Sequence, residues 1–88
     1  MTTQSITIQV KFFASLRESL GMSQINLTVP VESTVEMLLK EIQDTYGRDN
    51  PLIDIRHVHV AVNQQLVEFD QMIEQDDEIA IFPPITGG

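Results

Sequence analysis

The sequence of 88 residues contains no cysteine. The chain therefore forms no disulfide, offers no thiolate to a metal and has no thiol nucleophile, so this small protein must rely on packing for its stability. No apolar run approaches the roughly 18 residues that span a bilayer, and the first five residues lack the basic and apolar regions of a signal peptide. We expect a cytoplasmic protein that does not enter membranes.

Basic residues are scarce: five lysines and arginines stand against 13 aspartates and glutamates, for a formal net charge of −8. Such a surface repels nucleic acid and anionic membranes and steers the protein toward a basic partner. An alternative interpretation is that the acidity only keeps a small domain soluble.

Sequence patterns of an internal active site are also missing. There is no nucleophile elbow and no glycine-rich phosphate loop. His57 and His59 lie two residues apart, as zinc ligands can, but no third ligand is obvious. The acidic run from Glu74 to Glu78 lacks the spacing and central glycine of a calcium loop. We therefore predict no metal site, no intrinsic cofactor and no catalysis by the chain alone.

The apolar residues that are present, 42% of the chain, suit one domain with a single core. Alternation with period two predicts strands, and helical spacing with a Ser33-to-Glu36 capping box and a Gly21 stop predicts helices. The predicted strands cover 6–12, 23–29, 57–62, 66–69 and 78–82. One helix covers 14–20, and the main helix runs from the capping box at Ser33 up to Gly47. Loops or turns cover 48–54 and 63–65, and a turn or single helical turn covers 70–75.

One long helix after a first hairpin, followed by three more strands, is the element order of the β-grasp fold. We predict an α+β domain over residues 1–82 in which a mixed sheet curls around one main helix. Because one helix covers only one sheet face, the other face stays available. The strand register places Phe13, Ala80 and Phe82 on that face, with Leu66 near it. The plainer alternative is that these are scattered exposed apolar residues.

Residues 83–88 form a predicted flexible tail, Pro83-Pro84-Ile85-Thr86-Gly87-Gly88. The two prolines fix φ and supply no N–H, so the chain leaves the last strand as an extended spacer. Gly87 and Gly88 have no Cβ and can thread a narrow channel in a partner. This pattern indicates a terminal carboxylate used as a reactant, whereas an inert, disordered end is the alternative.

Three segments resemble the small subunits of molybdopterin synthase in the ubiquitin-like ThiS/MoaD sulfur-carrier family. They are residues 12–18 with Gly21, residues 62–70, and residues 77–88 with their Pro-Pro and Gly-Gly pairs. The resemblance covers nearly the whole chain. One departure is Asp76, where the family usually has a glycine, which puts the turn geometry there in question.

The resemblance implies that the Gly88 carboxylate is adenylated by an activating enzyme that uses ATP and magnesium. Sulfur from a donor then replaces AMP to give a thiocarboxylate. The tail would enter the large synthase subunit, in a heterotetramer, and donate sulfur to cyclic pyranopterin monophosphate. By position, Phe13, Leu66 and Phe82 correspond to apolar docking contacts, and Pro83, Pro84, Ile85 and Thr86 to the part of the tail that enters the partner.

Three other functions remain open at this point. A sulfur carrier for thiamin thiazole synthesis shares the fold and the Gly-Gly end, but such carriers are usually shorter and lack the Phe-Pro-Pro run. A ubiquitin-like modifier would join lysines through an isopeptide bond. A plain adaptor domain would carry an inert Gly-Gly end.

Overall fold

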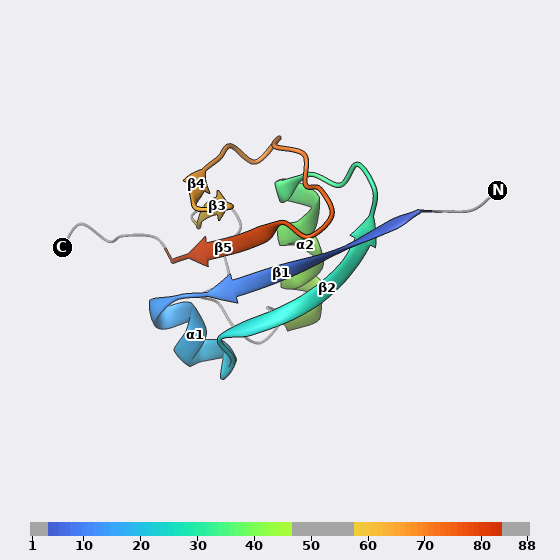
Figure 1. Ribbon diagram of the computed structural model, residues 1–88. Coiled ribbons are helices and arrows are strands. Elements are labelled where there is room, and N and C mark those ends of the chain that lie inside the picture. The colour runs from blue at the N-terminus through green and yellow to red at the C-terminus, as the bar shows by residue number, and fades with distance from the viewer. Residues whose placement is uncertain (1–3, 47–57, 84–88) are drawn as a thin grey trace.

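The computed structural model describes residues 4–46 and 58–83 of the chain. Its strands form one sheet with the spatial order β2-β1-β5-β3-β4. Helix α2 lies across one face of this sheet, and α1 lies beyond the end of β1 (Figure 1). The elements are β1 (Ser5–Phe12), α1 (Ala14–Leu20), β2 (Gln24–Pro30), α2 (Val35–Tyr46), β3 (His59–Val62), β4 (Gln65–Leu66) and β5 (Glu78–Phe82).

Strand β1 runs through the interior of the sheet, as its alternating sequence predicts. It pairs antiparallel with β2 and parallel with β5, which makes the sheet mixed. The side chains of Ile6, Ile8, Val10 and Phe12 are all buried on the face that α2 covers. Since successive strand residues point to opposite faces, this register sends Lys11 and the following Phe13 toward the other face.

The antiparallel partner β2 lies at one edge of the sheet. Its register places Leu27 opposite Ile8 and Val29 opposite Ile6. Val29 is buried, whereas Ile25 and Leu27 are only half-buried. The predicted inward face of this strand is therefore confirmed, with less complete burial toward Ile25.

Helix α2 packs on the sheet through the predicted apolar stripe: Val35, Leu38, Leu39 and Ile42 are buried. The predicted capping box is wrong in detail. The helix begins one residue later than that motif requires, and the Oγ1 atom of Thr34 accepts the N–H of Met37 at 3.3 Å. This places Thr34 at the N-cap.

Ser33 has a different structural role from the predicted one. Its side chain is buried, and its hydroxyl donates to the carbonyl oxygen of Pro30 at 2.6 Å. Glu36 does not reach back to it but pairs with Lys40 at 3.3 Å. Ser33 thus closes the turn that joins β2 to α2.

The short helix α1 has the predicted bounds and the predicted end. Gly21 adopts the left-handed conformation with φ of 71°, and its N–H donates to the carbonyl oxygen of Arg17 at 3.0 Å. A residue with a Cβ would be strained at this φ. Leu16 is buried, so α1 closes one end of the core.

Strands β3 and β4 form a tighter hairpin than the sequence pattern predicts. The turn consists of Asn63 and Gln64 alone, with φ of 51° and 72°. Two positive φ values give the primed turn that joins strands by two residues, so Gln65 already pairs with Val62. The predicted strand over 66–69 is therefore replaced by β4, which ends at Leu66.

The N–H of Val67 still donates to the carbonyl oxygen of Val60 at 3.1 Å, and only after this residue does the chain leave β3 and hydrogen-bond to the start of α2. The carbonyl oxygen of Phe69 accepts the N–H of Glu36, and that of Gln71 accepts the N–H of Val35, each at 2.9 Å. The first N–H groups of a helix have no partner inside the helix, so these bonds satisfy them. The turn or single helical turn predicted over 70–75 is present only at its two ends, where Gln71 N–H donates to Glu68 and Asp77 N–H to Glu74, each at 3.1 Å, while Met72 between them bridges to Thr34.

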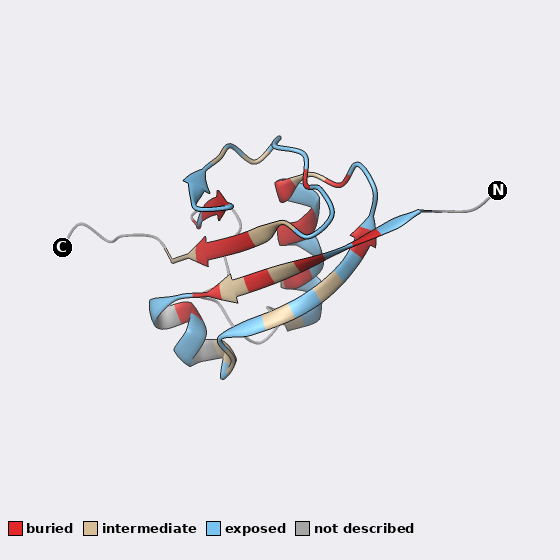
Figure 2. Ribbon diagram, viewed as in Figure 1, coloured by how far each residue is buried: buried red, intermediate tan, exposed pale blue. Residues whose placement is uncertain are grey.

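The core lies between α2 and the covered face of the sheet (Figure 2). It is completed by Val58, Val60, Val62, Ile73, Ile79 and Ile81, all of which are buried. The predicted inward positions of β3 and β5 are thereby confirmed. His57 and the predicted loop over 48–54 lie outside the described residues. Neither described helix is both long and apolar enough to cross a membrane.

Candidate docking face beside the C-terminal tail

Phe13 and Phe82 meet on the sheet face opposite α2. Their rings stack with centroids 4.8 Å apart and planes 16° from parallel. Phe13 has an extended backbone at the start of α1, with φ of −124°, and its N–H donates to the carbonyl oxygen of Ile81 at 3.3 Å. The parallel pairing of β1 with β5 therefore continues through Phe13 and holds the two rings side by side.

Two alanines form the floor beside these rings. Ala61 of β3 pairs with Ala80 of β5, and both are buried. Leu66 stands opposite Ala61 on β4 and is 74% exposed. Because alanine side chains are short, a hollow of about 440 Å³ opens between Leu66 and the two rings. We call Phe13, Ala61, Leu66, Ala80 and Phe82 the outer-face patch.

A charge pair borders the outer-face patch. The Nζ atom of Lys11 lies 3.2 Å from Oε2 of Glu78, and each side chain is 34% exposed. Both residues also line the hollow. A partly exposed pair of this kind contributes little to folding.

The hairpin that carries Leu66 is fixed by the side chain of Asn63. Its Nδ2 donates to Oδ1 of Asp77 at 2.9 Å, and its Oδ1 accepts the N–H of Glu78 at 3.0 Å. The other oxygen of Asp77 accepts the N–H of Glu74 at 2.8 Å. These bonds join the β3–β4 turn to the start of β5 and so position Leu66 relative to Phe82.

Asp76 adopts a left-handed backbone conformation in its turn, although the family usually has a glycine at this position. Its φ is 68°, and its N–H donates to the carbonyl oxygen of Thr7 at 3.0 Å. Oδ1 of Asp76 accepts a bond from Nε2 of Gln75 at 3.1 Å. The turn into β5 thus forms with aspartate, at the conformational cost of a left-handed residue with a Cβ.

The tail begins at this same end of the sheet. Strand β5 ends at Phe82, and Pro83, which is half-buried, is the last described residue. The predicted tail residues Pro84, Ile85, Thr86, Gly87 and Gly88 lie outside the described residues. The outer-face patch therefore lies immediately before the segment that the sequence singles out.

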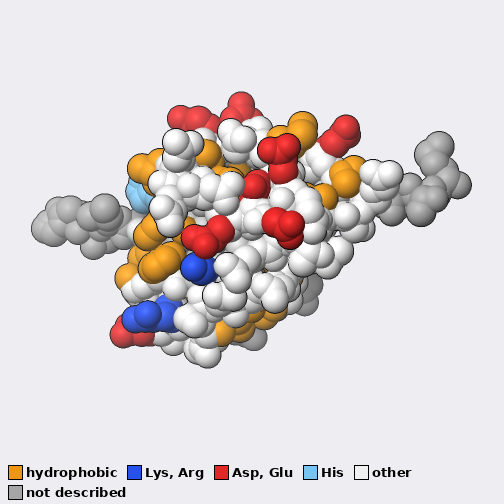
Figure 3. Space-filling view, viewed as in Figure 1, with side chains coloured by type: hydrophobic (Ala, Val, Ile, Leu, Met, Phe, Trp, Pro, Cys, Tyr) orange, Lys and Arg blue, Asp and Glu red, His pale blue; other side chains and the backbone are white. Residues whose placement is uncertain are grey.

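The charge distribution separates this end of the molecule from the rest. In Figure 3, apolar side chains gather near the end of β5, and Lys and Arg side chains lie near them. Asp and Glu side chains lie mostly across the upper part of the view. An apolar area beside both charge types suits a protein interface with polar surroundings.

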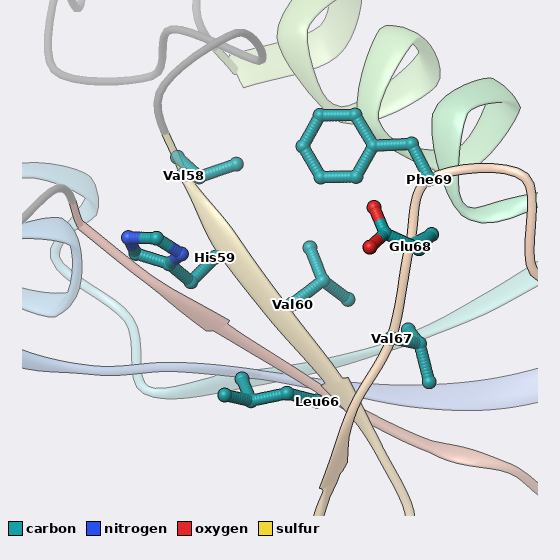
Figure 4. Close-up of a pocket in the computed structure, with 7 residues that line it drawn as sticks. All are labelled: Val58, His59, Val60, Leu66, Val67, Glu68 and Phe69. Atoms are coloured by element: carbon teal, nitrogen blue, oxygen red, sulfur yellow. The ribbon is translucent and has the colours of Figure 1, made fainter.

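A second hollow lies on the other side of β3. It has a volume of about 480 Å³ between β3 and the segment after β4, and it shares Leu66 with the outer-face patch. Figure 4 shows the ring of Phe69 beside the carboxylate of Glu68, with the imidazole of His59 on the far side of β3 from them. Among the described residues, no group of three or more His, Cys, Asp or Glu side chains could hold a metal ion.

Sequence reasoning placed Phe13, Leu66 and Phe82 near one another but missed three parts of the site. Ala61 had a signal, because the same period-two register that buries Val60 and Val62 turns it outward. Asn63 had a weaker one, since asparagine tolerates left-handed conformations. The Lys11–Glu78 pair required knowledge of the parallel β1–β5 pairing, which sequence periodicity does not give.

The sheet order, the single main helix and the exposed face define a ubiquitin-like β-grasp protein. A solved structure of molybdopterin converting factor subunit 1 from Pyrococcus furiosus matches with a TM-score of 0.77 and 26% identity, covering 91% of this chain and 99% of that one.

The sequence comparisons then place the chain more narrowly. A sequence model of the ThiS family matches residues 10–88, and the chain belongs to this family. It is 37% identical to the molybdopterin synthase sulfur carrier subunit of Escherichia coli, over 92% of this chain and 99% of that protein. It is also 31% identical to small archaeal modifier protein 3 of Haloferax volcanii, over 92% of this chain and 98% of that protein.

Proposed function

We propose that the chain is the sulfur-carrying small subunit of a molybdopterin synthase. The observation that carries the proposal is the position of the outer-face patch, directly before the Pro-Pro and Gly-Gly tail, in a chain that matches a curated carrier of this kind along almost its entire length. A carrier needs a docking surface close to a reactive end in the same chain, and this arrangement supplies both.

The chemistry takes place at Gly88. A carboxylate oxygen attacks the α-phosphorus of ATP in an activating enzyme, pyrophosphate leaves, and an acyl adenylate remains. A sulfur nucleophile from a donor then attacks the acyl carbon, and AMP leaves as the thiocarboxylate forms. Free carboxylates are poor acyl donors, so the adenylate is what makes the substitution feasible. ATP and magnesium belong to the activating enzyme, and this chain supplies the reacting carbon.

Sulfur transfer requires a second partner. The outer-face patch docks on the large synthase subunit, and the residues after Pro83 span at most about 17 Å when extended, enough to reach an interior active site. There the thiocarboxylate sulfur forms a C–S bond with cyclic pyranopterin monophosphate, and water then hydrolyses the acyl–sulfur bond, which restores the Gly88 carboxylate. Because the product dithiolene holds two sulfur atoms, two loaded small subunits serve each pterin, in a heterotetramer around a large-subunit dimer. We place this assembly in the cytoplasm.

Charge favours the same partners. The chain carries a net charge of −8, and sites that bind ATP or a pterin phosphate are built from basic groups. Long-range attraction between an acidic carrier and a basic site raises the association rate without adding contacts. The large subunit and the activating enzyme are therefore expected to present basic surfaces around the opening that admits the tail.

A ubiquitin-like modifier is the second candidate function. It is supported by the 31% identity to the Haloferax volcanii modifier protein. Adenylation of Gly88 is shared with the first candidate, but the acyl group would then pass to a lysine amine. A carrier for thiamin thiazole synthesis differs from the first candidate only in the acceptor of the sulfur.

One experiment separates these functions. The full chain is coexpressed with its activating enzyme and a sulfur donor, and its intact mass is measured. We expect a species in which one oxygen is replaced by sulfur, and conversion of cyclic pyranopterin monophosphate when the large subunit is added. Conjugates to other proteins without a thiocarboxylate would support the modifier, and a thiocarboxylate that is inert with the large subunit would support the thiamin route. If neither product forms, the result would support a plain adaptor domain.

A further inference from the structure

Strand β2 leaves one side of its backbone without a partner strand. The N–H of Phe12 donates to the carbonyl oxygen of Ser23, and the N–H of Val31 donates to that of Gln4. This register turns the backbone groups of Ile25, Leu27 and Val29 toward β1. In antiparallel sheets the backbone groups of the intervening residues, here Gln24, Asn26 and Thr28, point away from the partner strand. In the part of the chain that the structure describes, no strand pairs with that side of β2.

Within the described residues, this edge has few of the features that usually protect an open strand. It is seven residues long and carries no charged residue, and Pro30 interrupts it only at its last position. Natural edge strands are usually short, charged or bulged, because an open edge is a template for another strand. On the face toward α2, Ile25 and Leu27 are only half-buried. A further strand beside β2 would cover them.

An apolar hollow adjoins the same edge. It has a volume of about 340 Å³ between β2 and α2, with Val29, Pro30 and Leu38 among its lining residues. Met37 lines it as well and is 52% exposed. A flexible, unbranched thioether adapts to side chains of different shapes. The hollow is therefore suited to an aliphatic side chain that projects from a strand lying along β2.

The charges around the hollow are mostly negative. Glu41 lines it, and Glu32 and Glu36 are exposed on the turn and the first turn of α2. The nearby Lys40 is engaged with Glu36 at 3.3 Å. A segment with basic residues flanking its apolar part complements this rim, whereas an acidic segment or a second copy of this chain, with its own charge of −8, is repelled.

We propose that the free edge of β2 and the hollow between β2 and α2 bind an extended, basic-flanked peptide segment of a partner protein. The segment adds to the sheet as a further strand. Its backbone exchanges hydrogen bonds with the backbone of Gln24, Asn26 and Thr28, and one of its aliphatic side chains lies against Met37. This site is distinct from the outer-face patch. Pro30 of β2 pairs with Ser5 at the start of β1. The tail follows β5, which pairs with the end of β1, so the two sites lie toward opposite ends of β1.

The two sites also lie toward opposite edges of the sheet, because β2 is the first strand in the spatial order and β4 is the last. In Figure 1 the β2–α2 turn and the end of β5 lie on opposite sides of the molecule. A peptide on β2 therefore leaves the outer-face patch free, so the carrier can be held by one protein while its tail is in use by another.

The test uses a defined peptide, Ac-KKTVTITKK-NH2, titrated into the full ¹⁵N-labelled chain. We expect amide shift changes at Gln24, Asn26, Thr28 and Met37, slowed hydrogen exchange at the three β2 amides, and no change at Phe82. An analogue that is N-methylated at the amides facing β2 keeps the same side chains and charges but cannot donate hydrogen bonds to β2. It should bind at least about tenfold more weakly. Equal binding of the methylated analogue would overturn the proposal.

Matched variants locate the site. Met37→Glu should weaken the peptide about tenfold or more, because it removes the apolar wall and adds a like charge to the rim. Met72→Glu is the control, since Met72 is 51% exposed but does not line the hollow, and it should leave binding unchanged. An acidic peptide, Ac-EETVTITEE-NH2, should bind more weakly than the basic one at low salt, and the difference should shrink as salt is added.

Other outcomes contradict the inference. Shift changes confined to the outer-face patch, or no binding at millimolar peptide, would overturn it. A concentration-dependent dimer in sedimentation that Asn26→Pro abolishes, with no effect of peptide, would assign the edge to a second copy and also overturn it. Asn26→Pro removes an N–H that points away from β1, so the fold tolerates it, and the spectrum of the free variant verifies this.

Discussion

The ring of Phe13 stacks on the ring of Phe82 at 4.8 Å, although the two residues lie near opposite ends of the chain. The parallel alignment of β1 with β5 produces this contact, because it brings the first residue after β1 beside the last residue of β5. The apolar surface is therefore already assembled at the point where the tail begins, and the proposed docking would not need to order it. Preorganisation of this kind lowers the cost of binding.

The first prediction concerns this stack. Phe82→Asp should weaken binding to the large synthase subunit by about 10- to 100-fold, because burial of a phenylalanine at an interface contributes about 1.5 to 3 kcal/mol. The free energy of unfolding should fall by only about 1 kcal/mol, the value of an exposed aromatic pair. Calorimetric titration measures the first quantity and urea denaturation the second.

Met72→Asp is the matched control for that experiment. Met72 is 51% exposed and lies outside the outer-face patch, so its replacement should change neither quantity appreciably. If Phe82→Asp bound the large subunit as tightly as Met72→Asp, the outer-face patch would not be the docking surface.

The second prediction concerns the tail. Deletion of Gly88 should abolish formation of the thiocarboxylate and sulfur transfer, because the shortened chain ends one residue too early to reach the catalytic site of the activating enzyme. The unfolding temperature should stay the same, since every core residue in the described part of the chain precedes the tail. Intact mass after incubation with activating enzyme, ATP and sulfur donor checks the first part, and calorimetry checks the second. Restored molybdenum-enzyme activity with the deletion variant would contradict the proposed chemistry.

Much of this architecture could be predicted from periodicity. The alternation of Ile6, Ile8 and Val10 and the helical spacing of Leu38 and Ile42 each record which face is buried, and the structure confirms them. These patterns are strong because burial of each apolar side chain is favourable whatever its neighbours are.

What could not be predicted depends on which of several competing hydrogen bonds forms. Ser33 and Thr34 are both competent N-caps, and the choice of Thr34 follows from the bond of Ser33 to Pro30. Strand β4 is short because Phe69 bonds to the first turn of α2. Pro30 is a local partner, but a sequence pattern does not show whether Ser33 caps the helix or closes the turn. Phe69 lies far from α2 in the sequence, so its bond depends on how the turns and the helix pack in three dimensions.

The third prediction concerns the bonds of Asn63. Asn63→Ala should lower the free energy of unfolding by about 2 to 3 kcal/mol, because it loses the bonds to Asp77 and Glu78 and leaves a β-carbon at φ of 51° without the tolerance of asparagine. Asn63→Gly keeps the backbone conformation and loses only the side-chain bonds, so about 1 kcal/mol is expected. Urea denaturation of both variants measures the difference. Equal losses would show that the turn conformation contributes nothing.

The fourth prediction concerns Asp76. Its φ of 68° is left-handed, a conformation that costs a residue with a Cβ roughly 1 to 2 kcal/mol relative to glycine. Asp76→Gly relieves this cost but gives more freedom to the unfolded chain and loses the exposed bond from Gln75, so the net gain should be about 0.5 to 1 kcal/mol.

For a domain of this size, that gain corresponds to a rise of about 2 to 8 °C in the unfolding temperature, which calorimetry resolves. Asp77→Gly is the control, because Asp77 accepts bonds from Asn63 and Glu74 and its loss should destabilise the same turn. The N–H of Asp76 bonds to Thr7 through the backbone, so glycine at 76 preserves that contact and the approach of the turn to β1. A lower unfolding temperature for Asp76→Gly would mean that the aspartate side chain stabilises the turn by more than its backbone conformation costs.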